Sequence, residues 1–278
     1  MNAAQAAGRA GGDSANGMGR VLILAGSDSG GGAGVQADIK AVTMMGGFAA
    51  TAITAITVQN TLGVHGVHPL PLDLIAAQAR AVLEDIGTDA VKTGMLGSVE
   101  VVETVAALLD EADAPAVVDP VMVAKGGHSL LPDAAVEAVK RLMIPRAALL
   151  TPNASEAEAL TGFAVHDLDG QRRAGEALLA LGARAVLMKG GHVSGPTVID
   201  LLMTADGETV LEAERIDTRH THGTGCTLAS ACAAGLAMGR PLEVAVAEAW
   251  AYVGEAIRRA PGLGGGHGPL DHGWPVRG

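Results

Sequence analysis

The chain has 278 residues, a formal net charge of −11 at pH 7, and 49% hydrophobic residues, of which very few are aromatic. An acidic balance argues against binding to the phosphate backbone of nucleic acids, which requires a basic surface. No apolar run reaches the roughly 20 residues of a membrane-spanning helix, and the first nineteen residues lack the apolar core of a signal peptide. We therefore expect a cytoplasmic protein that binds neither nucleic acid nor membrane.

The length fits one large α/β domain. Residues 1–19 are mostly Ala, Gly, Asn and Ser and are expected to form a flexible tail, which leaves residues 20–278 as a single domain. Cys226 and Cys232 lie about 9 Å apart along one expected helix and on different faces of it. They should not pair with each other, because a disulfide needs Cα atoms about 5.5 Å apart.

Short apolar runs alternate with helical patterns along the chain. Strands are expected at 21–25, 49–58, 89–92, 116–119, 147–150, 184–189, 197–203 and 209–213, and helices at 35–45, 72–86, 99–109, 134–143, 171–181, 224–238 and 242–259. The last two strands flank Asp206-Gly207, a hairpin turn signal. This alternation predicts an α/β fold with a mostly parallel central sheet and helices on both faces. Ligands of such sheets bind beyond the carboxyl ends of the strands.

A glycine-rich loop, residues 26–34 (GSDSGGGAG), follows the first expected strand. Residues 32–37 match a relaxed GxGxxA fingerprint, but no Asp or Glu occurs between Asp38 and Asp73 to hold a dinucleotide ribose. The loop also lacks the GK[ST] ending of a P-loop. Two interpretations stay open: a turn that packs a helix on a strand, or a backbone that closely approaches a small flat ligand.

The segment His222-Gly223-Thr224-Gly225-Cys226 opens a helix of small residues. Its backbone N–H groups lie at a helix N-terminus, where the macrodipole favours an anion. The same dipole should lower the pKa of the Cys226 thiol, so we expect thiolate to be accessible near neutral pH. Cys232 is expected to be a small core residue.

Four more polar residues lie at or just after the ends of expected strands. Asn153 and Glu156 have the spacing of a helix capping box, and they are alternatively an amide and a carboxylate that face a magnesium nucleotide. Lys189 precedes two glycines and could pair with phosphates, and Asp119 ends another strand. The nine histidines have no metal-binding signature and are interpreted as surface or loop residues.

Seven blocks in chain order resemble the ribokinase-like superfamily, and within it the hydroxymethylpyrimidine/phosphomethylpyrimidine kinases of thiamin biosynthesis. The blocks are AGSDSGGGAGVQADIK, ITAITVQNT, VKTGML, VVDPVM, LLTPNASEAEALTG, VLMKGGH and HGTGCT. The resemblance covers about residues 21–272 and implies a three-layer ribokinase-like fold. It also implies ATP-dependent phosphorylation of 4-amino-5-hydroxymethyl-2-methylpyrimidine, and then of its monophosphate, by what we expect to be a homodimer that uses ATP and Mg²⁺.

The resemblance implies a role for each matching residue. Gly223, Thr224, Gly225 and the Cys226 backbone would form the anion hole for the transferring phosphoryl group, and the Cys226 side chain would be the base. Asn153, Glu156 and Lys189 would serve ATP and Mg²⁺, with Asp119 as a further metal ligand. The pyrimidine pocket would be lined by Gln59, Gly26, Asp38, Met95 and Val121. Most ribokinase-like sugar kinases have Asp at the position of Cys226.

Two rival functions remain. A pyridoxal kinase of the same cysteine-bearing branch would have the same fold and chemistry but a different ring. A non-catalytic pyrimidine-binding protein would have kept the pocket, although an intact GTGC segment with Lys189 and Glu156 argues against it. Gln59 favours the pyrimidine, because a carboxamide pairs with the ring nitrogen and amino group of a 4-aminopyrimidine as it does with adenine.

Overall fold

The computed structural model describes residues 17–122, 131–191 and 195–277. Residues 1–16, most of the segment expected to be a flexible tail, lie outside the described residues. The strands are β1 (Arg20–Ala25), β2 (Phe48–Ile53), β3 (Ala55–Asn60), β4 (Gly63–Pro69), β5 (Ala90–Thr93), β6 (Ala116–Val118), β7 (Ala147–Leu150), β8 (Ala185–Met188), β9 (Thr197–Thr204) and β10 (Gly207–Glu214). The helices are α1 (Gly34–Met44), α2 (Leu72–Asp85), α3 (Val99–Ala112), α4 (Asp133–Ala138), α5 (Ala154–Thr161), α6 (Leu168–Ala180), α7 (Thr224–Ala237) and α8 (Leu242–Arg258).

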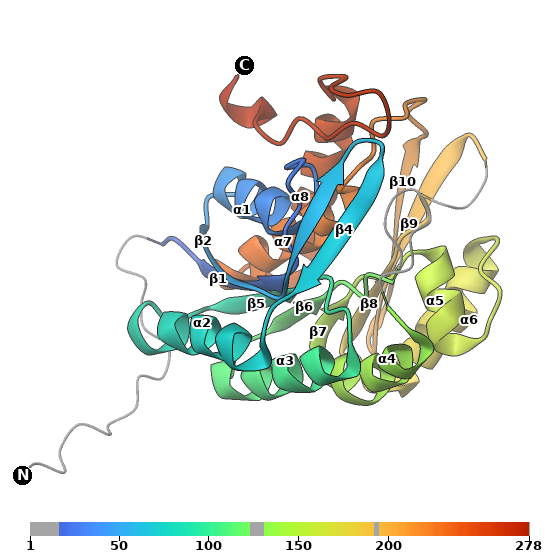
Figure 1. Ribbon diagram of the computed structural model, residues 1–278. Helices are drawn as coiled ribbons and strands as arrows, with labels where there is room; N and C mark the ends of the chain where they lie inside the picture. Colours follow the sequence, from blue (N-terminus) through green and yellow to red (C-terminus); the bar gives the residue numbers. More distant parts are fainter. Residues whose placement is uncertain (1–16, 123–130, 192–194, 278) are drawn as a thin grey trace, which may run out of the picture.

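The described strands form an eight-stranded sheet in the order β10-β9-β8-β7-β6-β5-β1-β2 and a separate two-stranded sheet, β3-β4. Pairing from β2 to β8 is parallel, whereas β9 is antiparallel to both β8 and β10. Helices α1, α7 and α8 cover one face of the sheet and α2, α3, α4 and α6 the other (Figure 1). The predicted three-layer, mostly parallel α/β fold is confirmed.

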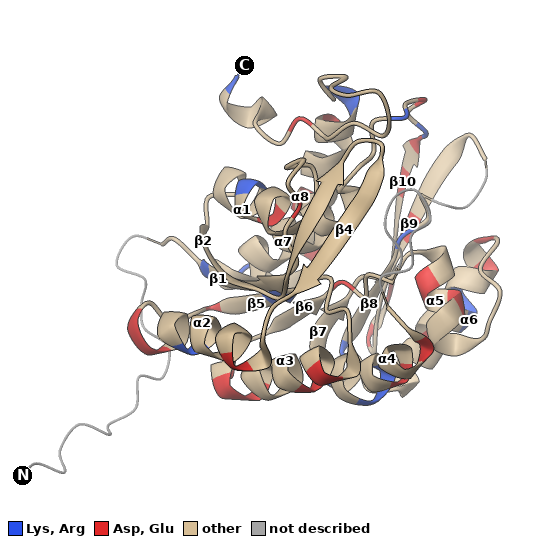
Figure 2. Ribbon diagram, in the orientation of Figure 1, with Lys and Arg blue, Asp and Glu red and all other residues tan. Residues whose placement is uncertain are grey.

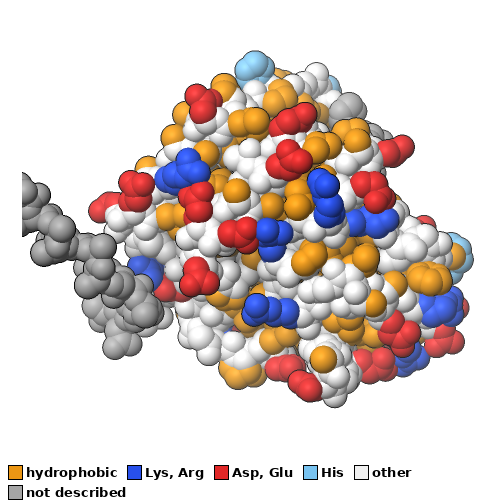
Figure 3. Space-filling model, turned by 90° about the horizontal axis from the view of Figure 1, so that it is seen from below, with side chains coloured by type: hydrophobic (Ala, Val, Ile, Leu, Met, Phe, Trp, Pro, Cys, Tyr) orange, Lys and Arg blue, Asp and Glu red, His pale blue; other side chains and the backbone are white. Residues whose placement is uncertain are grey.

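The core on each face follows from the alternation of side chains along the strands. In β1, Val21, Ile23 and Ala25 pack with the α1, α7 and α8 side, while Leu22 and Leu24 pack with the opposite helices. The face formed by α2, α3 and α4 carries charges of both signs, interspersed (Figure 3), with ion pairs such as Arg80–Glu111 at 2.7 Å.

The prediction of a single strand at 49–58 is wrong, because the segment forms two strands that are separated at Thr54. The Thr54 N–H donates to Ala25 O at 3.0 Å, and its side chain donates to Met95 O at 2.8 Å. Beyond it, β3 leaves the main sheet and pairs antiparallel with β4. Residue composition did not mark this break, since β-branched residues continue through it. Strand β4 was missed because GVHGVHP contains few strong strand formers.

One helix also differs from expectation. The helix expected at 134–143 is α4 followed by one π-helical turn, Val139–Met143. The Gly/Pro-rich C-terminal segment packs back onto the domain: Gly268 O accepts from the His222 N–H at 3.1 Å, and the Tyr252 hydroxyl donates to His272 O at 2.7 Å. In the described part of the chain, no helix has both the length and the apolar character needed to cross a membrane.

Candidate active site

A cavity of about 820 Å³ lies at the carboxyl ends of the parallel strands. Its wall includes the residue after each of several strands: Gly26 after β1, Gly94 after β5, Asp119 after β6 and Lys189 after β8. The start of α7 and residues of the β3–β4 hairpin complete the wall. The polar clusters singled out in the sequence therefore come together in one cavity, as parallel strand topology requires.

The N-terminus of α7 opens onto this cavity. Gly223 is the N-cap at φ 82°, and a Cβ atom there would lie within 1.8 Å of Gly32 O, so only glycine fits. Gly225 and Cys226 follow in the first turn, whose N–H groups have no acceptor inside the helix. Gly223, Thr224, Gly225 and Cys226 all line the cavity. This geometry suits a bound anion.

Lys189 carries the positive charge beside that helix end. Its Nζ lies 2.9 Å from Asp119 Oδ1 and 3.8 Å from Glu156 Oε2. Burial opposes its charge, but the two carboxylates outweigh burial and raise the pKa of Lys189. A Cβ atom on Gly225 would lie 3.0 Å from Lys189 Nζ, so the ammonium group approaches the first turn of α7 closely.

Asn153 and Glu156 form the capping box that their spacing predicts. Asn153 Oδ1 accepts from the Glu156 N–H at 3.0 Å, and Glu156 Oε2 accepts from the Asn153 N–H at 2.8 Å. Both residues also line the cavity. Burial, opposed by Lys189, raises the pKa of Glu156 to about 7. The capping role thus does not exclude a nucleotide-facing role, because one carboxylate faces both the helix start and the cavity.

The expected low pKa of Cys226 is wrong. Burial raises the pKa of this thiol to about 11, although Lys92 and the Gly34 N–H act in the opposite direction. The helix dipole is therefore outweighed by the loss of water around the sulfur atom. Neither Cys226 nor Cys232 is in a disulfide, which confirms that they do not pair.

Asp38, expected in the pyrimidine pocket, is completely buried and is not among the residues that line the cavity. It accepts hydrogen bonds from Lys92 Nζ at 2.8 and 2.9 Å and from Ser230 Oγ at 2.7 Å. Lys92 borders the cavity and joins Asp38 to it. The sequence placed Asp38 on a helix near the glycine-rich loop but could not show which face of that helix it occupies. Its position fits a support for Lys92.

The other four residues expected around the ring do line the cavity: Gln59, Gly26, Met95 and Val121. Gly26 leaves room for Met95, whose Cε would lie 2.4 Å from a Cβ atom at that position. Gln59 reaches the site from β3. Ser27, Ala33 and Gly34 of the glycine-rich loop also line the cavity, and close approach of this loop to a small flat ligand stays a prediction.

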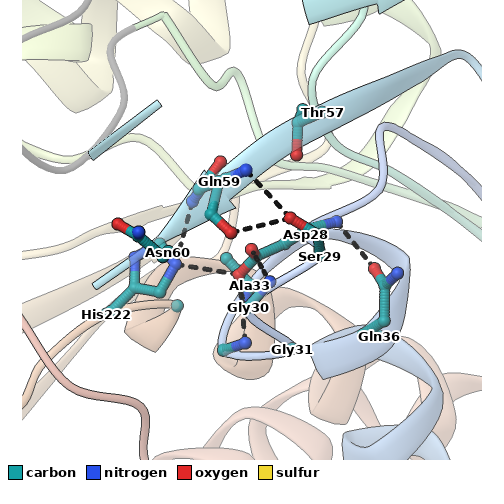
Figure 4. A network of polar contacts seen from close by, with 12 residues as sticks. Asp28, Ser29, Gly30, Gly31, Ala33, Gln36, Thr57, Gln59, Asn60 and His222 are labelled. Carbon is teal, nitrogen blue, oxygen red and sulfur yellow. Dashed lines mark hydrogen bonds and ion pairs between the residues drawn. The ribbon is translucent and has the colours of Figure 1, made fainter. Parts of the chain in front are cut away.

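Sequence reasoning missed two functional candidates, Asp28 and His222 (Figure 4). His222 is buried, with Nε2 2.9 Å from Asp28 Oδ2 and 3.0 Å from Gln59 Nε2. Interpreting it as an ordinary loop histidine was wrong. A buried charge partner nearly 200 positions away leaves no local signal, although His222 directly precedes the GTGC segment. Among the described residues, no three His, Cys, Asp or Glu side chains gather as a ready metal site.

Comparisons with known proteins agree with this geometry. The family model described as phosphomethylpyrimidine kinase matches residues 28–271. A hydroxymethylpyrimidine/phosphomethylpyrimidine kinase from Streptomyces coelicolor is 54% identical over 256 residues, which are 92% of this chain and 95% of that protein.

Two solved structures are also similar. An ADP complex of Bacillus subtilis pyridoxal kinase has a TM-score of 0.88 at 36% identity and covers 94% of this chain and 100% of its own. A phosphomethylpyrimidine kinase from Clostridium difficile has a TM-score of 0.77 at 41% identity and covers 86% of this chain and 99% of its own. Together with the strand-end cavity, these similarities show that the chain belongs to the phosphomethylpyrimidine kinase family.

Proposed function

We propose that this kinase transfers the γ-phosphoryl group of ATP to the hydroxymethyl group of 4-amino-5-hydroxymethyl-2-methylpyrimidine, and then phosphorylates the monophosphate to the pyrophosphate ester. The observation that carries the proposal is the joint presence of Gln59 and the N-terminus of α7 on the wall of one cavity. The first can recognise a heterocycle through its edge, and the second can stabilise a phosphoryl group. The S. coelicolor relative, whose name states both substrates, supports it.

The nucleotide would bind at the part of the cavity wall formed by Lys189, Asn153 and Glu156. Lys189 is well placed to pair with phosphate oxygens, because its ammonium group lies beside the first turn of α7, close to Gly225. Asp119 and Glu156 fit a Mg²⁺ ion, which usually takes one or two protein carboxylates and completes its shell with phosphates and water. Such an ion supplies charge neutralisation at the phosphates.

The reaction needs charge stabilisation more than covalent help, because the transition state of phosphoryl transfer is loose. N–H groups of the first turn of α7 and the Lys189 ammonium group would neutralise the oxygens of the transferring group. Cys226 is the proposed base that removes the alcohol proton. Its thiol has to ionise first, and a thiolate would be stabilised by Lys92 nearby. In the reducing cytoplasm, our proposed location, both cysteines stay thiols.

Pyridoxal phosphorylation is the second candidate, because the B. subtilis pyridoxal kinase shares the fold over nearly the whole chain. Gln59 favours the pyrimidine. A 4-aminopyrimidine offers a ring acceptor beside an amino donor, which a carboxamide can pair at about 1–3 kcal/mol of discrimination. Pyridoxal lacks this edge and would leave the carboxamide partly unpaired.

An ATP-consumption assay over a panel of alcohols tests the proposal. The panel contains hydroxymethylpyrimidine, pyridoxal and pyridoxine, and a reaction without an alcohol gives the background ATPase rate. We expect kcat/KM for the pyrimidine to exceed that for pyridoxal by about 10-fold or more, as one good bidentate pair provides. A higher kcat/KM for pyridoxal would assign the chain to the second candidate instead.

We also infer that the enzyme is a homodimer in which a second copy covers the β3–β4 hairpin. The hairpin carries no Lys, Arg, Asp or Glu (Figure 2), and Ile56, Val58 and Val67 are exposed on it. A two-stranded sheet has little stability of its own, so an apolar cover would stabilise it. Light scattering after size exclusion should give twice the chain mass of 27.8 kDa, and a mass of one chain would reject the dimer.

A further inference from the structure

Two buried groups at the cavity wall, Asp28 and His222, have no role in the proposed phosphoryl transfer and contact the half-buried Gln59. Asp28, His222 and Gln59, here called the amide clamp, come from the glycine-rich loop, the segment before α7 and strand β3 (Figure 4). A single ring nitrogen, His222 Nε2, lies 2.9 Å from Asp28 Oδ2 and 3.0 Å from Gln59 Nε2. All three residues line the cavity.

Asp28 determines where the proton of His222 lies. Its carboxylate accepts backbone N–H groups from Gly30 at 2.8 Å, Gly32 at 3.0 Å and Ala33 at 2.8 Å. Burial alone would raise the pKa of Asp28, but the hydrogen bond from His222 and the N–H groups of Ala33 and Gly30 lower this pKa below its usual value. An ionised carboxylate can only accept hydrogen bonds. The contact with His222 therefore requires the hydrogen on Nε2.

This proton restricts the side chain of Gln59. A ring nitrogen carries one hydrogen, and two acceptors can share the one on His222 Nε2: Asp28 Oδ2 at 2.9 Å and the carboxamide end of Gln59 at 3.0 Å. The end of the Gln59 carboxamide that lies 3.0 Å from His222 Nε2 is favourable there as the C=O oxygen, which can accept the Nε2–H. An NH₂ group at the same place would put two hydrogen-bond donors against each other. A half turn about the Cγ–Cδ bond of Gln59 exchanges its NH₂ and C=O ends, which have nearly the same size and shape.

We propose that His222, held by Asp28, fixes the carboxamide of Gln59 with Oε1 toward His222 and the NH₂ group available to a ring acceptor of the substrate. This inference rests on the proposed pyrimidine kinase function and adds a selectivity device to it. Oε1 can accept from both His222 and the exocyclic amino group, while the NH₂ group donates to the ring nitrogen beside it. Asp28 and His222 are thus positioning residues, which act through Gln59.

A fixed carboxamide should make the enzyme discriminate against a substrate analogue in which an oxo group replaces the 4-amino group of the pyrimidine. In a pyrimidin-4-one the ring position next to the oxo group carries N–H, so the donor and acceptor of the edge are exchanged. A carboxamide that turns freely could serve either edge, whereas a fixed one leaves two mismatched contacts with the oxo compound. Selectivity gained by disfavouring the wrong ligand is a common use of such fixed polar groups.

The test compares kcat/KM for the 4-amino substrate and its 4-oxo analogue in four proteins. His222→Phe keeps a planar ring without the donor, His222→Gln returns an N–H near the Nε2 position, and Gln59→Met removes the carboxamide. We expect the amino preference to be about 10²-fold in the wild type and about 10-fold lower in His222→Phe. His222→Gln should restore most of it. KM for ATP reports any disturbance of the neighbouring α7 N-terminus.

The double variant Gln59→Met/His222→Phe separates positioning from a direct effect. Its amino preference should equal that of Gln59→Met, because His222 acts through the carboxamide. If His222→Phe folds poorly, His222→Leu takes its place in the comparison. An unchanged amino preference in the His222 variants would overturn the clamp while leaving the proposed function intact. A wild-type enzyme that phosphorylates neither pyrimidine would reject both.

Discussion

Cys226 lies among opposed charges, since Lys92 acts to lower the pKa of its thiol while Asp38 and Asp119 act to raise it. Burial dominates and gives a pKa of about 11. Near neutral pH only a small fraction of such a thiol is ionised. If the thiolate is the base, kcat should be limited by the ionised fraction of Cys226. Below the pKa, this fraction rises about tenfold with each unit of increase in pH.

Replacing Cys226 by Ala should lower kcat by about 10²–10⁴, the usual range for a lost general base. KM for the pyrimidine should change much less, because Cys226 is the proposed base and not a ring contact. Wild-type kcat should rise between pH 7 and 9, where the thiolate fraction grows. Cys232→Ala, a buried cysteine on the same helix, is the matched control. Near-wild-type turnover by Cys226→Ala would show that the thiol is not the base.

The first turn of α7 is the element on which phosphoryl transfer should depend. In Gly225→Ala the added Cβ atom would lie 3.0 Å from Lys189 Nζ and 3.7 Å from Asp119 Oδ2, inside the proposed phosphoryl site. We expect kcat/KM to fall about 10²-fold, as for loss of one oxyanion-hole donor, with little change in Tm. Gly265→Ala is the control, because a Cβ atom there meets only Leu62 Cδ2 at 3.7 Å. Equal kcat/KM in both variants would argue against an anion hole at this turn.

Most elements of the sheet and its helices were predictable because their signals are local. Apolar runs ended by Gly, Pro or polar residues mark strands such as β1, and the spacing of Asn153 and Glu156 marks the start of α5. The β3–β4 hairpin was not predictable. Its first strand continues the β-branched pattern of β2, and the break at Thr54 depends on hydrogen bonds to Ala25, Leu70 and Met95 that are distant in sequence.

At the scale of the whole molecule, the continuous eight-stranded sheet supports our proposal that residues 20–278 form one domain. Strand topology brought the predicted polar clusters into a single cavity, which sequence order alone anticipates for parallel sheets. The sequence did not show in which direction the side chains of Asp38 and His222 point. Asp38 turns inward to Lys92, and His222 turns to Asp28 and Gln59, because buried polar groups take partners wherever the fold supplies them.

Phosphorus NMR of the purified enzyme with 4-amino-5-hydroxymethyl-2-methylpyrimidine, Mg²⁺ and excess ATP tests the proposed function most directly. We expect a monophosphate ester first and then the two coupled signals of its pyrophosphate ester, with ADP formed at each step. Gly225→Ala should slow both steps. A spectrum that holds only the monophosphate after prolonged incubation would contradict the second phosphorylation. A spectrum with no phosphorylated pyrimidine at all would contradict the assigned function.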